Sequence, residues 1–178
     1  FWIWLQLKVI ADIGIIGLPN AGKSSLLAAL TRAKPKVASY PFTTINPSLG
    51  VTYYNNKEIT LADIPGLIEG AHKGAGLGDK FLRHIERCKT LLHLIDITEE
   101  DLVTSYRKIR SELSAYDENL SKKKEIIFFN KSDLLKKDEI KMKLNIFKNK
   151  IHKKHEIISV FLQKDIQKIK KILIKNAS

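Results

Sequence analysis

The sequence predicts an α/β fold of three layers, in which a mostly parallel β-sheet lies between helices and has one antiparallel strand at its edge. Along the 178 residues, apolar runs of strand length alternate with segments of helical periodicity, as in sheets covered by helices on both faces. A glycine-containing loop joins the first predicted strand to the first predicted helix. Two β-rich stretches flank a short polar turn at residues 55–57, which predicts an antiparallel hairpin.

Each element is justified by its apolar pattern and by the breaks around it. The first helix, for example, has Leu26, Leu27 and Leu30 on one side, which is expected to face the sheet. The elements expected in chain order are strand 9–16, helix 24–32, the hairpin strands 49–54 and 58–62, helix 80–88, strand 91–96, helix 101–116, strand 125–129, helix 138–150, strand 156–160 and helix 164–175.

Two segments are expected to be functional loops. Residues 34–47 contain three prolines, which a helix interior does not tolerate, so they are predicted to form a long loop. Residues 66–78 contain five glycines and are too permissive to hold one conformation alone. Both are candidate switch segments.

Length and composition favour one domain with a full core, since 44% of the residues are hydrophobic. The formal net charge is +12, from 31 basic and 19 acidic side chains, and favours a polyanionic partner such as RNA or an acidic membrane surface. A compositional bias toward lysine, isoleucine and asparagine explains the same charge. Composition alone leaves both explanations open.

The single cysteine, Cys88, excludes an internal disulfide and a multi-cysteine metal site, and predicts a reducing cytoplasm. It is expected to be a buried or half-buried helix residue. No apolar run approaches the roughly 20 residues that cross a bilayer, and the opening residues 1–8 lack the features of a signal peptide. Because the chain starts without Met and with two tryptophans, we expect it to be cut from a longer polypeptide.

A phosphate-binding loop is predicted between the first strand and the first helix. The sequence GLPNAGKS matches G-x-x-x-x-G-K-[ST] in the required strand–loop–helix context. Its amides and the helix N-terminus favour an anion, Lys23 is expected to reach the β- and γ-phosphates, and Ser24 to bind Mg²⁺. The predicted contacts are Gly17, Leu18, Pro19, Asn20, Ala21, Gly22, Lys23, Ser24 and Ser25.

A guanine-recognition site is predicted directly after strand 125–129. Its sequence is Asn130-Lys131-Ser132-Asp133. A carboxylate at Asp133 can accept two hydrogen bonds from the N1 and N2 donors of guanine, which adenine lacks, so adenine would leave a charge unsatisfied. Lys131 is expected to lay its methylenes along the base, and Asn130 to brace the loop.

The two switch segments are expected to complete the magnesium and γ-phosphate contacts. Asp63-Ile64-Pro65-Gly66 follows a strand end, where the carboxylate can hold Mg²⁺ through a water and the Gly66 amide can contact the γ-phosphate. In the first segment Thr44 is the preferred Mg²⁺ ligand, and Thr43 is the alternative.

The residues resemble the Obg GTPases. The matching segments are residues 11–12 (AD), 33–44 (AKPKVASYPFTT), 63–72 (DIPGLIEGAH) and 76–87 (GLGDKFLRHIER), besides the loops above. The resemblance implies a G domain over residues 1–178 with a GTPase fold, in which residues 1–8 link to a glycine-rich N-terminal domain outside this chain. It implies a cytoplasmic, Mg²⁺-dependent switch that hydrolyses GTP and associates with the large ribosomal subunit, its rRNA and proteins, in assembly and stress or growth control. We expect a monomer with no membrane association.

The resemblance also assigns residues. Ser24 and Thr44 would bind Mg²⁺, with Asp63 acting through a water, and Lys23, Thr44 and Gly66 would act on the transferred phosphate. The family usually ends its nucleoside pocket with a Ser-Ala pair, for which the candidate here is the segment starting at Ser159. Further nucleotide contacts by this resemblance are Phe42, Thr43, Thr44, Ile45, Asn46, Ser159, Val160 and Phe161.

Catalysis is expected to be slow without an activator. Leu67 occupies the position where many small GTPases place a glutamine that orients water. A potassium ion bound near Asn20, or a ribosomal partner, could supply the missing positive charge, although asparagine also simply suits a tight loop. Structural roles are favoured for His84 and His93, while His72 lies in the second switch. Residues 122–124, all lysine, are expected to form a solvated turn more often than an RNA contact.

Three classes of function fit these features. The first is a GTPase enzyme used as a switch. The second is a catalytically idle binding module that reports guanine nucleotide levels, which Leu67 keeps open. The third is a G domain severed from a membrane transporter or a tRNA-modifying enzyme, against which the matches at residues 40–44 and 66–72 argue.

Overall fold

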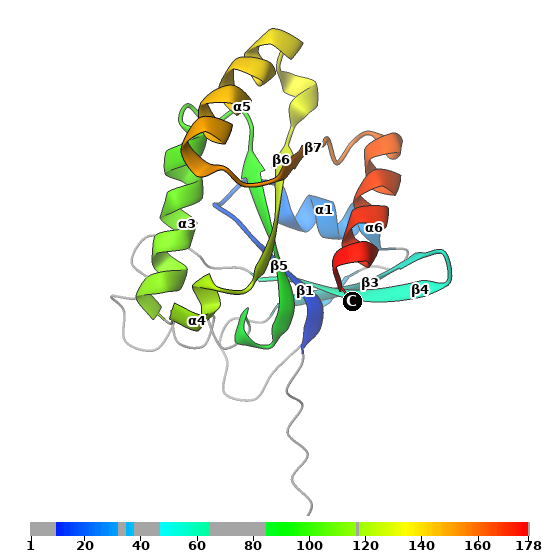
Figure 1. The fold of residues 1–178 in the computed structure, drawn as a ribbon. Coiled ribbons are helices and arrows are strands. Elements are labelled where there is room, and N and C mark those ends of the chain that lie inside the picture. Colours follow the sequence, from blue (N-terminus) through cyan, green and yellow to red (C-terminus); the bar gives the residue numbers. More distant parts are fainter. Residues whose placement is uncertain (1–9, 32–34, 38–46, 65–84, 117, 178) are drawn as a thin grey trace, which may run out of the picture.

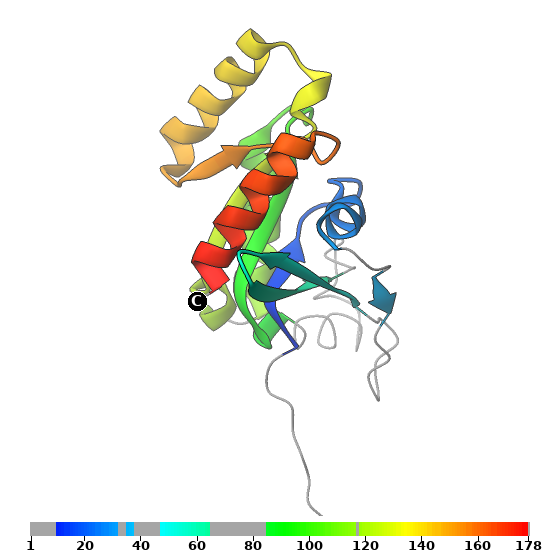
Figure 2. The ribbon, with the colours of Figure 1, turned by 90° about the vertical axis from the view of Figure 1, so that its right-hand side faces the viewer.

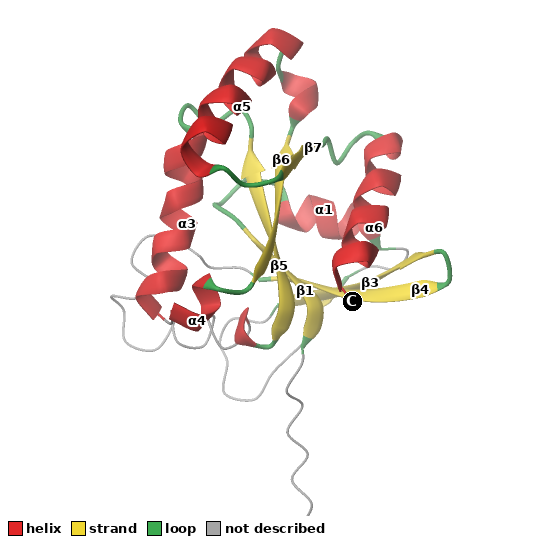
Figure 3. Ribbon diagram, in the orientation of Figure 1, coloured by secondary structure: helices red, strands yellow, loops and turns green. Residues whose placement is uncertain are grey.

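A computed structural model describes residues 10–31, 35–37, 47–64, 85–116 and 118–177. Its centre is a seven-stranded sheet with the order β2-β3-β4-β1-β5-β6-β7 (Figures 1 and 3). The strands are β1 (Ala11–Ile16), β2 (Lys36–Val37), β3 (Ser48–Tyr54), β4 (Lys57–Asp63), β5 (Cys88–Asp96), β6 (Lys124–Asn130) and β7 (His155–Ile157). The helices are α1 (Lys23–Leu30), α3 (Leu102–Tyr116), α4 (Glu118–Ser121), α5 (Lys137–Ile151) and α6 (Gln163–Ala177), with a short 3-10 turn η1 (Ser132–Leu134).

The mostly parallel sheet confirms the predicted fold class. Strands β4, β1, β5, β6 and β7 pair in parallel, and β3 is antiparallel to β4. The antiparallel strand is not at the very edge, because β2 pairs with β3 in antiparallel register within the loop predicted from its prolines. In the hairpin, Asn55 and Asn56 have φ of 49° and 59°, as a two-residue turn with positive φ at both positions requires.

Helices cover both faces of the sheet (Figures 1 and 2). On one face, α1 and α6 pack their apolar side chains, among them Leu26, Leu30 and Ile169, against the central strands. On the other face, α3 and α5 bury side chains such as Val103 and Phe147. The core therefore lies on both sides of β1, β5 and β6, and the carboxyl ends of these strands are left to form a site.

Two boundaries differ from the prediction for a reason that lies in strand pairing. Cys88 is buried as expected, but it begins β5 rather than ending a helix, because it pairs with Ala11 of β1. Of the predicted helix 80–88, residues 85–86 are helical and residues 80–84 lie outside the described residues. The last strand ends at Ile157, so Ser159 and Val160 lie in the connection to α6 and not in a strand.

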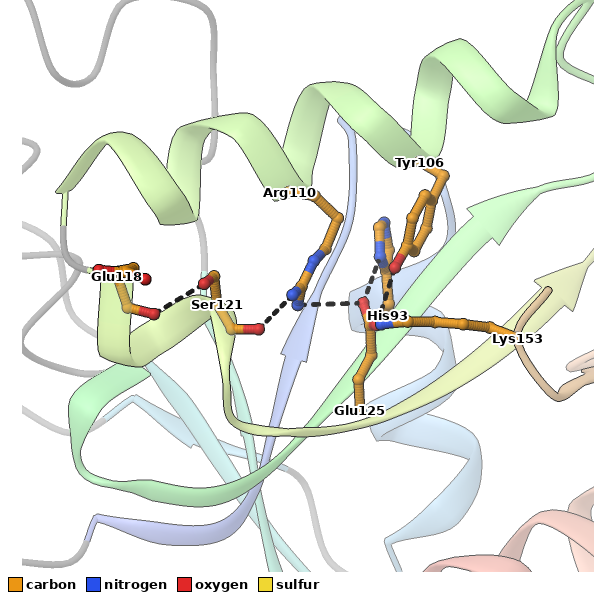
Figure 4. A network of polar contacts seen from close by, with 7 residues as sticks. All are labelled: His93, Tyr106, Arg110, Glu118, Ser121, Glu125 and Lys153. Atoms are coloured by element: carbon orange, nitrogen blue, oxygen red, sulfur yellow. Dashed lines mark hydrogen bonds and ion pairs between the residues drawn. The ribbon is translucent and has the colours of Figure 1, made fainter. Parts of the chain in front are cut away.

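A buried polar network ties α3 to strands β5 and β6 (Figure 4). The Glu125 side chain is 3% exposed. One of its carboxylate oxygens lies 3.1 Å from His93 Nδ1 and 3.6 Å from Arg110 Nη1. The other accepts hydrogen bonds from the Tyr106 hydroxyl at 3.0 Å and from Lys153 Nζ at 2.6 Å. This arrangement is structural, as expected for His93.

The network determines which groups are charged. Burial raises the pKa of Glu125, but the hydrogen bonds from His93 and Lys153 and the Arg110 charge outweigh it and lower the pKa to about 2. Burial lowers the pKa of His93, against the opposing effect of Glu125. Both pKa shifts are consistent with a neutral His93 that donates its Nδ1 hydrogen to the ionised Glu125 carboxylate.

The three lysines at 122–124 are not a free basic turn. Lys122 pairs with Glu118 on the surface. Lys123 Nζ donates to the carbonyl oxygens of Glu86 and Cys88, at 2.9 and 2.7 Å. Lys124 Nζ donates to the carbonyl oxygen of Asn176 at 3.0 Å. Lys123 thus links the start of β6 to the start of β5, and Lys124 links it to the end of α6.

Candidate functional site

The loop between β1 and α1 has a backbone path that depends on two glycines. Gly17 has φ of 155° and Gly22 has φ of 96°. A Cβ on Gly17 would lie 2.3 Å from the carbonyl oxygen of Leu94, and one on Gly22 would lie 2.5 Å from Asn130 Nδ2. The loop is therefore packed tightly against the carboxyl-terminal parts of β5 and β6, and a side chain at either glycine would displace it.

The start of α1 is suited to an anion. Its N-cap residue is Gly22, which has no side chain to bond the amides of the first turn, and that turn contains no acidic residue. The first amides of a helix have no intrahelical partner, and the helix dipole favours negative charge there. A phosphate at this position would be bound by the backbone itself.

Lys23 supplies the positive charge beside this helix end. Its ammonium donates to the carbonyl oxygens of Gly17 and Leu18, each at 3.0 Å. Burial lowers its pKa, and the charge of Asp63 acts in the opposite direction. These contacts hold the Lys23 side chain across the loop, near the helix N-terminus.

Ser24 and Asp63 form an oxygen pair at the ends of α1 and β4. The Ser24 hydroxyl donates to Asp63 Oδ2 at 2.6 Å. Asp63 is buried, and its Oδ1 has no hydrogen-bond partner among the described residues. A buried carboxylate oxygen without a partner is costly, and a hydroxyl beside a carboxylate is the donor set that Mg²⁺ accepts together with phosphate oxygens and waters. These residues fit a magnesium ion.

Ser24 and Asp63 alone do not complete the octahedral shell of oxygen ligands that Mg²⁺ requires. Among the residues that the structure describes, no cluster of three or more His, Cys, Asp or Glu side chains is arranged to hold a metal. A metal at Ser24 and Asp63 would therefore need further oxygen ligands from a bound phosphate, from water or from the switch segments.

Asn130 joins the phosphate loop to the loop after β6. Its Nδ2 donates to the carbonyl oxygen of Ala21 at 3.0 Å, and its Oδ1 accepts from the Val160 amide at 3.2 Å. The side chain is 1% exposed. One buried amide group thus holds three segments together that are far apart in the sequence.

Lys131 is held by a carboxylate that the sequence analysis did not single out. Lys131 has φ of 67°, and its Nζ lies 2.5 Å from Asp96 Oδ2. Asp96 Oδ1 accepts from the amide and hydroxyl of Thr98, at 2.9 and 2.7 Å. Burial raises the pKa of Asp96, but the hydrogen bonds from Lys131 and Thr98 prevail and lower it. An ionised Asp96 positions the Lys131 side chain.

The segment before α6 is ordered by a second carboxylate that was also missed. The Ser159 amide donates to Asp165 Oδ2 at 2.8 Å, and the Phe161 amide donates to Ser159 Oγ at 3.3 Å. Ser159 is fully buried, whereas Phe161 is 79% exposed. Asp165 lies in the first turn of α6, where the helix dipole favours an acidic residue, and this pattern could have been recognised in the sequence.

These segments surround a cleft of about 390 Å³. It is lined by Asn20, Gly22, Lys23, Ser24, Ser25, Asn130, Lys131, Val160 and Phe161. Part of the predicted phosphate loop therefore lines the same cleft as Asn130, Lys131, Val160 and Phe161 of the predicted nucleoside site. Asp133 is exposed and, with Ser132, lines a neighbouring hollow of about 670 Å³ beside α5.

The remaining predicted site residues are distributed around the cleft or cannot be described. Leu18 is half-buried, Pro19 and Asn20 are exposed, and Ala21 is buried. The φ of 64° at Asn20 is one that asparagine tolerates well. Ile64 is buried in the core, so only its backbone could contact a ligand. Predicted residues outside the described ones are Phe42, Thr43, Thr44, Ile45, Asn46, Pro65, Gly66, Leu67, His72 and His84.

The geometry combines an anion-binding helix end, a positive charge, a magnesium-type oxygen pair and a second pocket wall on the β6 side. Such a cleft can bind the phosphates and the base of one nucleotide. In the part of the chain that the structure describes, none of the helices has the length and apolar character needed to span a membrane.

Comparisons with known proteins find similarity to GTPases. Residues 12–131 match the family model described as "50S ribosome-binding GTPase". The GTPase Obg of Pelagibacter ubique is 58% identical over 176 residues, 99% of this chain and 54% of that protein. The GTPase Obg of Ehrlichia ruminantium is 57% identical over 175 residues, 98% of this chain and 51% of that protein. The chain thus spans about half the length of these curated relatives.

Solved structures share the fold. An Era variant from Aquifex aeolicus bound to GDP·AlF4⁻ has a TM-score of 0.67 at 24% identity, over 92% of this chain and 56% of that one. The G domain of the T. maritima FeoB iron transporter has a TM-score of 0.65 at 22% identity, over 93% and 98% of the two chains. At these identities the likeness extends to the fold alone.

Proposed function

The chain belongs to the family of 50S ribosome-binding GTPases, and from this premise we propose that it binds GTP in the cleft and hydrolyses it to GDP and phosphate. One observation carries the proposal. The Asn130 side chain bonds both Ala21 in the phosphate loop and Val160 in the segment before α6, so the parts that would bind phosphate and base form one unit.

Guanine selectivity is assigned to Asp133. Its carboxylate would accept from N1 and N2 of the base, while the Lys131 methylenes lie along the ring and Val160 and Phe161 form the opposite wall. Adenine would leave the carboxylate without donors, which costs several kcal/mol in comparable sites. The Asp96–Lys131 pair supports this role because it fixes the lysine before the base arrives.

Magnesium would be held by Ser24 and by Asp63 through a water, with Thr44 as a further ligand from the first switch. The unpartnered Asp63 Oδ1 supports this assignment. Held by these residues, Mg²⁺ would supply positive charge that offsets the negative charge of the phosphates. Thr44 lies outside the described residues, so its part rests on the sequence.

The chain's own contribution to hydrolysis is positioning and charge. Lys23 would exchange its carbonyl partners on Gly17 and Leu18 for β- and γ-phosphate oxygens, and the α1 amides would bind the β-phosphate. The Gly66 amide would contact the γ-phosphate. Leu67 offers no polar atom to orient water, so turnover is slow until a potassium ion near Asn20 or a ribosomal partner adds positive charge.

The cellular role that follows is a cytoplasmic, monomeric switch in large ribosomal subunit assembly and in stress or growth control. The family description and the 58% identity to a GTPase Obg support it. We assign the main ribosomal contact to a glycine-rich domain preceding residues 1–8, as the resemblance implies.

The proposal is tested by nucleotide binding and turnover. Fluorescent GDP should bind the chain in Mg²⁺ and be displaced by GTP but not by ATP. Multiple-turnover phosphate release should be slow, higher in KCl than in NaCl, stimulated by large ribosomal subunits, and abolished in Lys23→Ala. Displacement by ATP would refute guanine selectivity. Binding without any turnover, even with ribosomal subunits, would instead favour the binding module.

A further inference from the structure

The positive charge of this protein is concentrated in its last third. Residues 122–178 contain 17 lysines and 6 acidic residues, a net charge of +11, whereas residues 1–121 contain 14 basic and 13 acidic residues, a net charge of +1. Nearly all of the net charge of +12 therefore comes from the part of the chain that follows α4. A uniform lysine bias would have spread it more evenly.

Part of this charge forms a stripe along α6. Lys164, Lys168, Lys171 and Lys175 follow one another at intervals of four, three and four residues. With 3.6 residues per turn, their side chains lie within about 60° of each other around the helix axis. All four are exposed. The stripe is about 16 Å long, at 1.5 Å per residue.

The opposite side of α6 packs into the hydrophobic core. Ile166, Ile169 and Leu173 are buried against the sheet and α1. Figure 2 shows α6 along the outside of the sheet, with no other described element lying over it. The lysine stripe is thus the outward face of a helix whose position is fixed by its apolar face.

Most of the stripe has no structural task within the described part of the chain. Lys168 pairs with Glu156 at 2.7 Å, on the surface. Lys164, Lys171 and Lys175 have no ion-pair or hydrogen-bond partner among the described residues. By contrast, Lys123, Lys124 and Lys153 are occupied by carbonyl or carboxylate oxygens. The ammonium groups of these three lysines are available to an external anion.

We propose that the lysine stripe of α6 binds the phosphate backbone of structured RNA. A nucleic acid strand carries a phosphate about every 3.4 Å along the helix axis, so a row about 16 Å long can contact several phosphates at once. The stripe contains no aromatic side chain for stacking on unpaired bases, which favours backbone contacts to a duplex.

An acidic membrane surface fits this face less well. Membrane-bound amphipathic helices insert an apolar face beside their basic one. In α6 the apolar residues are already buried beneath the helix, so only electrostatic attraction would remain. The RNA contact rests on the ribosome association proposed above, but it requires no nucleotide hydrolysis, so the two can fail separately.

The test is the salt dependence of RNA binding by this chain. A fluorescently labelled RNA hairpin with a stem of about 20 base pairs, longer than the roughly 16 that a double-stranded-RNA domain spans, is titrated at several KCl concentrations. The stripe variant is Lys164→Gln/Lys171→Gln/Lys175→Gln. The control variant is Lys57→Gln/Lys150→Gln/Lys154→Gln, which removes the same charge from exposed lysines outside α6 and outside the switch segments. Glutamine retains helix propensity and length.

The unaltered chain should bind the hairpin with a steep salt dependence. The slope of log K against log salt should fall by about 2 to 3 in the stripe variant, since each lost phosphate contact is worth about 0.9. Affinity should drop at least tenfold, and the control variant should keep most of both. Circular dichroism and fluorescent GDP binding should be unchanged in both variants, which shows that the fold and the cleft are intact.

Three results would overturn the inference. Equal losses in the stripe and control variants would mean that total charge, and not α6, matters. Binding of the stripe to vesicles with anionic lipid, with no binding to RNA, would assign the face to a membrane. If RNA fails to bind while GDP still binds, the RNA inference alone is lost. If GDP fails and RNA binds, the nucleotide function is lost instead.

Discussion

Replacing Glu125 with glutamine tests how much the buried network contributes to stability. The substitution keeps the shape but removes the charge that faces His93, Arg110 and Lys153 (Figure 4). Folding lowers the Glu125 pKa from 4.5 to about 2, and one pKa unit corresponds to 1.36 kcal/mol. The full shift is therefore worth about 3 kcal/mol. Because Lys153 is 43% exposed and screened by solvent, we expect a loss of about 2 to 3 kcal/mol.

The sign of the pH dependence follows from the direction of the shift. Since the folded-state pKa of Glu125 is depressed, its stabilisation is complete above the unfolded value of 4.5 and is lost as the pH falls toward about 2. A protonated glutamate resembles glutamine, so the difference between the two proteins should shrink over this range. Below about 6.5 the unfolded chain also protonates His93, whose folded-state pKa is lowered; this destabilises both proteins.

The measurement is urea unfolding at pH 7, 5 and 3, monitored by circular dichroism. The matched control is Glu156→Gln, whose carboxylate is 43% exposed and pairs with Lys168 on the surface. That control should change the free energy of unfolding by less than about 0.5 kcal/mol. A Glu125→Gln difference below about 0.5 kcal/mol at pH 7, or one that stays constant down to pH 3, would refute the argument.

Three further predictions follow from single residues. Asn130→Ala leaves two buried backbone groups without partners, so the free energy of unfolding should fall by about 2 to 4 kcal/mol and GDP affinity by at least tenfold. The control Asn145→Ala, at an exposed position, should change neither quantity. Equal GDP affinities for the two variants would contradict the prediction. Gly17→Ala places a methyl against the Leu94 carbonyl and should abolish fluorescent GDP binding, a prediction that retained affinity would exclude. Cys88 is buried, and burial raises its pKa to about 12. It should therefore react with a thiol reagent at pH 8 only when urea unfolds the chain. Rapid labelling of the folded chain would instead show that the start of β5 is accessible to solvent.

Local pattern was sufficient where the chemistry lies in consecutive residues. The GLPNAGKS segment predicted the strand–loop–helix order, and β1 and α1 flank it as expected. Alternation of apolar runs predicted the parallel sheet, and the hairpin was expected near its observed turn at Asn55 and Asn56. In these segments short-range sterics and periodicity decide the structure.

The bounds of elements that depend on pairing with a distant strand were harder to predict from the sequence. Cys88 has a helix-like neighbourhood in the sequence but joins β5, because Ala11 lies opposite it. Lys36 and Val37 form β2 only because β3 offers an edge to pair with. Such pairing energy comes from residues that are not neighbours in the chain, so no local window contains it.

The class of ligand and the residue types expected to contact it could be predicted from the sequence, because glycine, lysine, serine and aspartate act through intrinsic chemistry. Which groups meet could be learned only from the folded chain. It joined Asp96 to Lys131 and Asp165 to Ser159, and it enclosed Glu125 among His93, Tyr106 and Lys153. Hydrogen bonds and desolvation depend on distances across the fold, and those distances are established only when the sheet and both helix layers have packed.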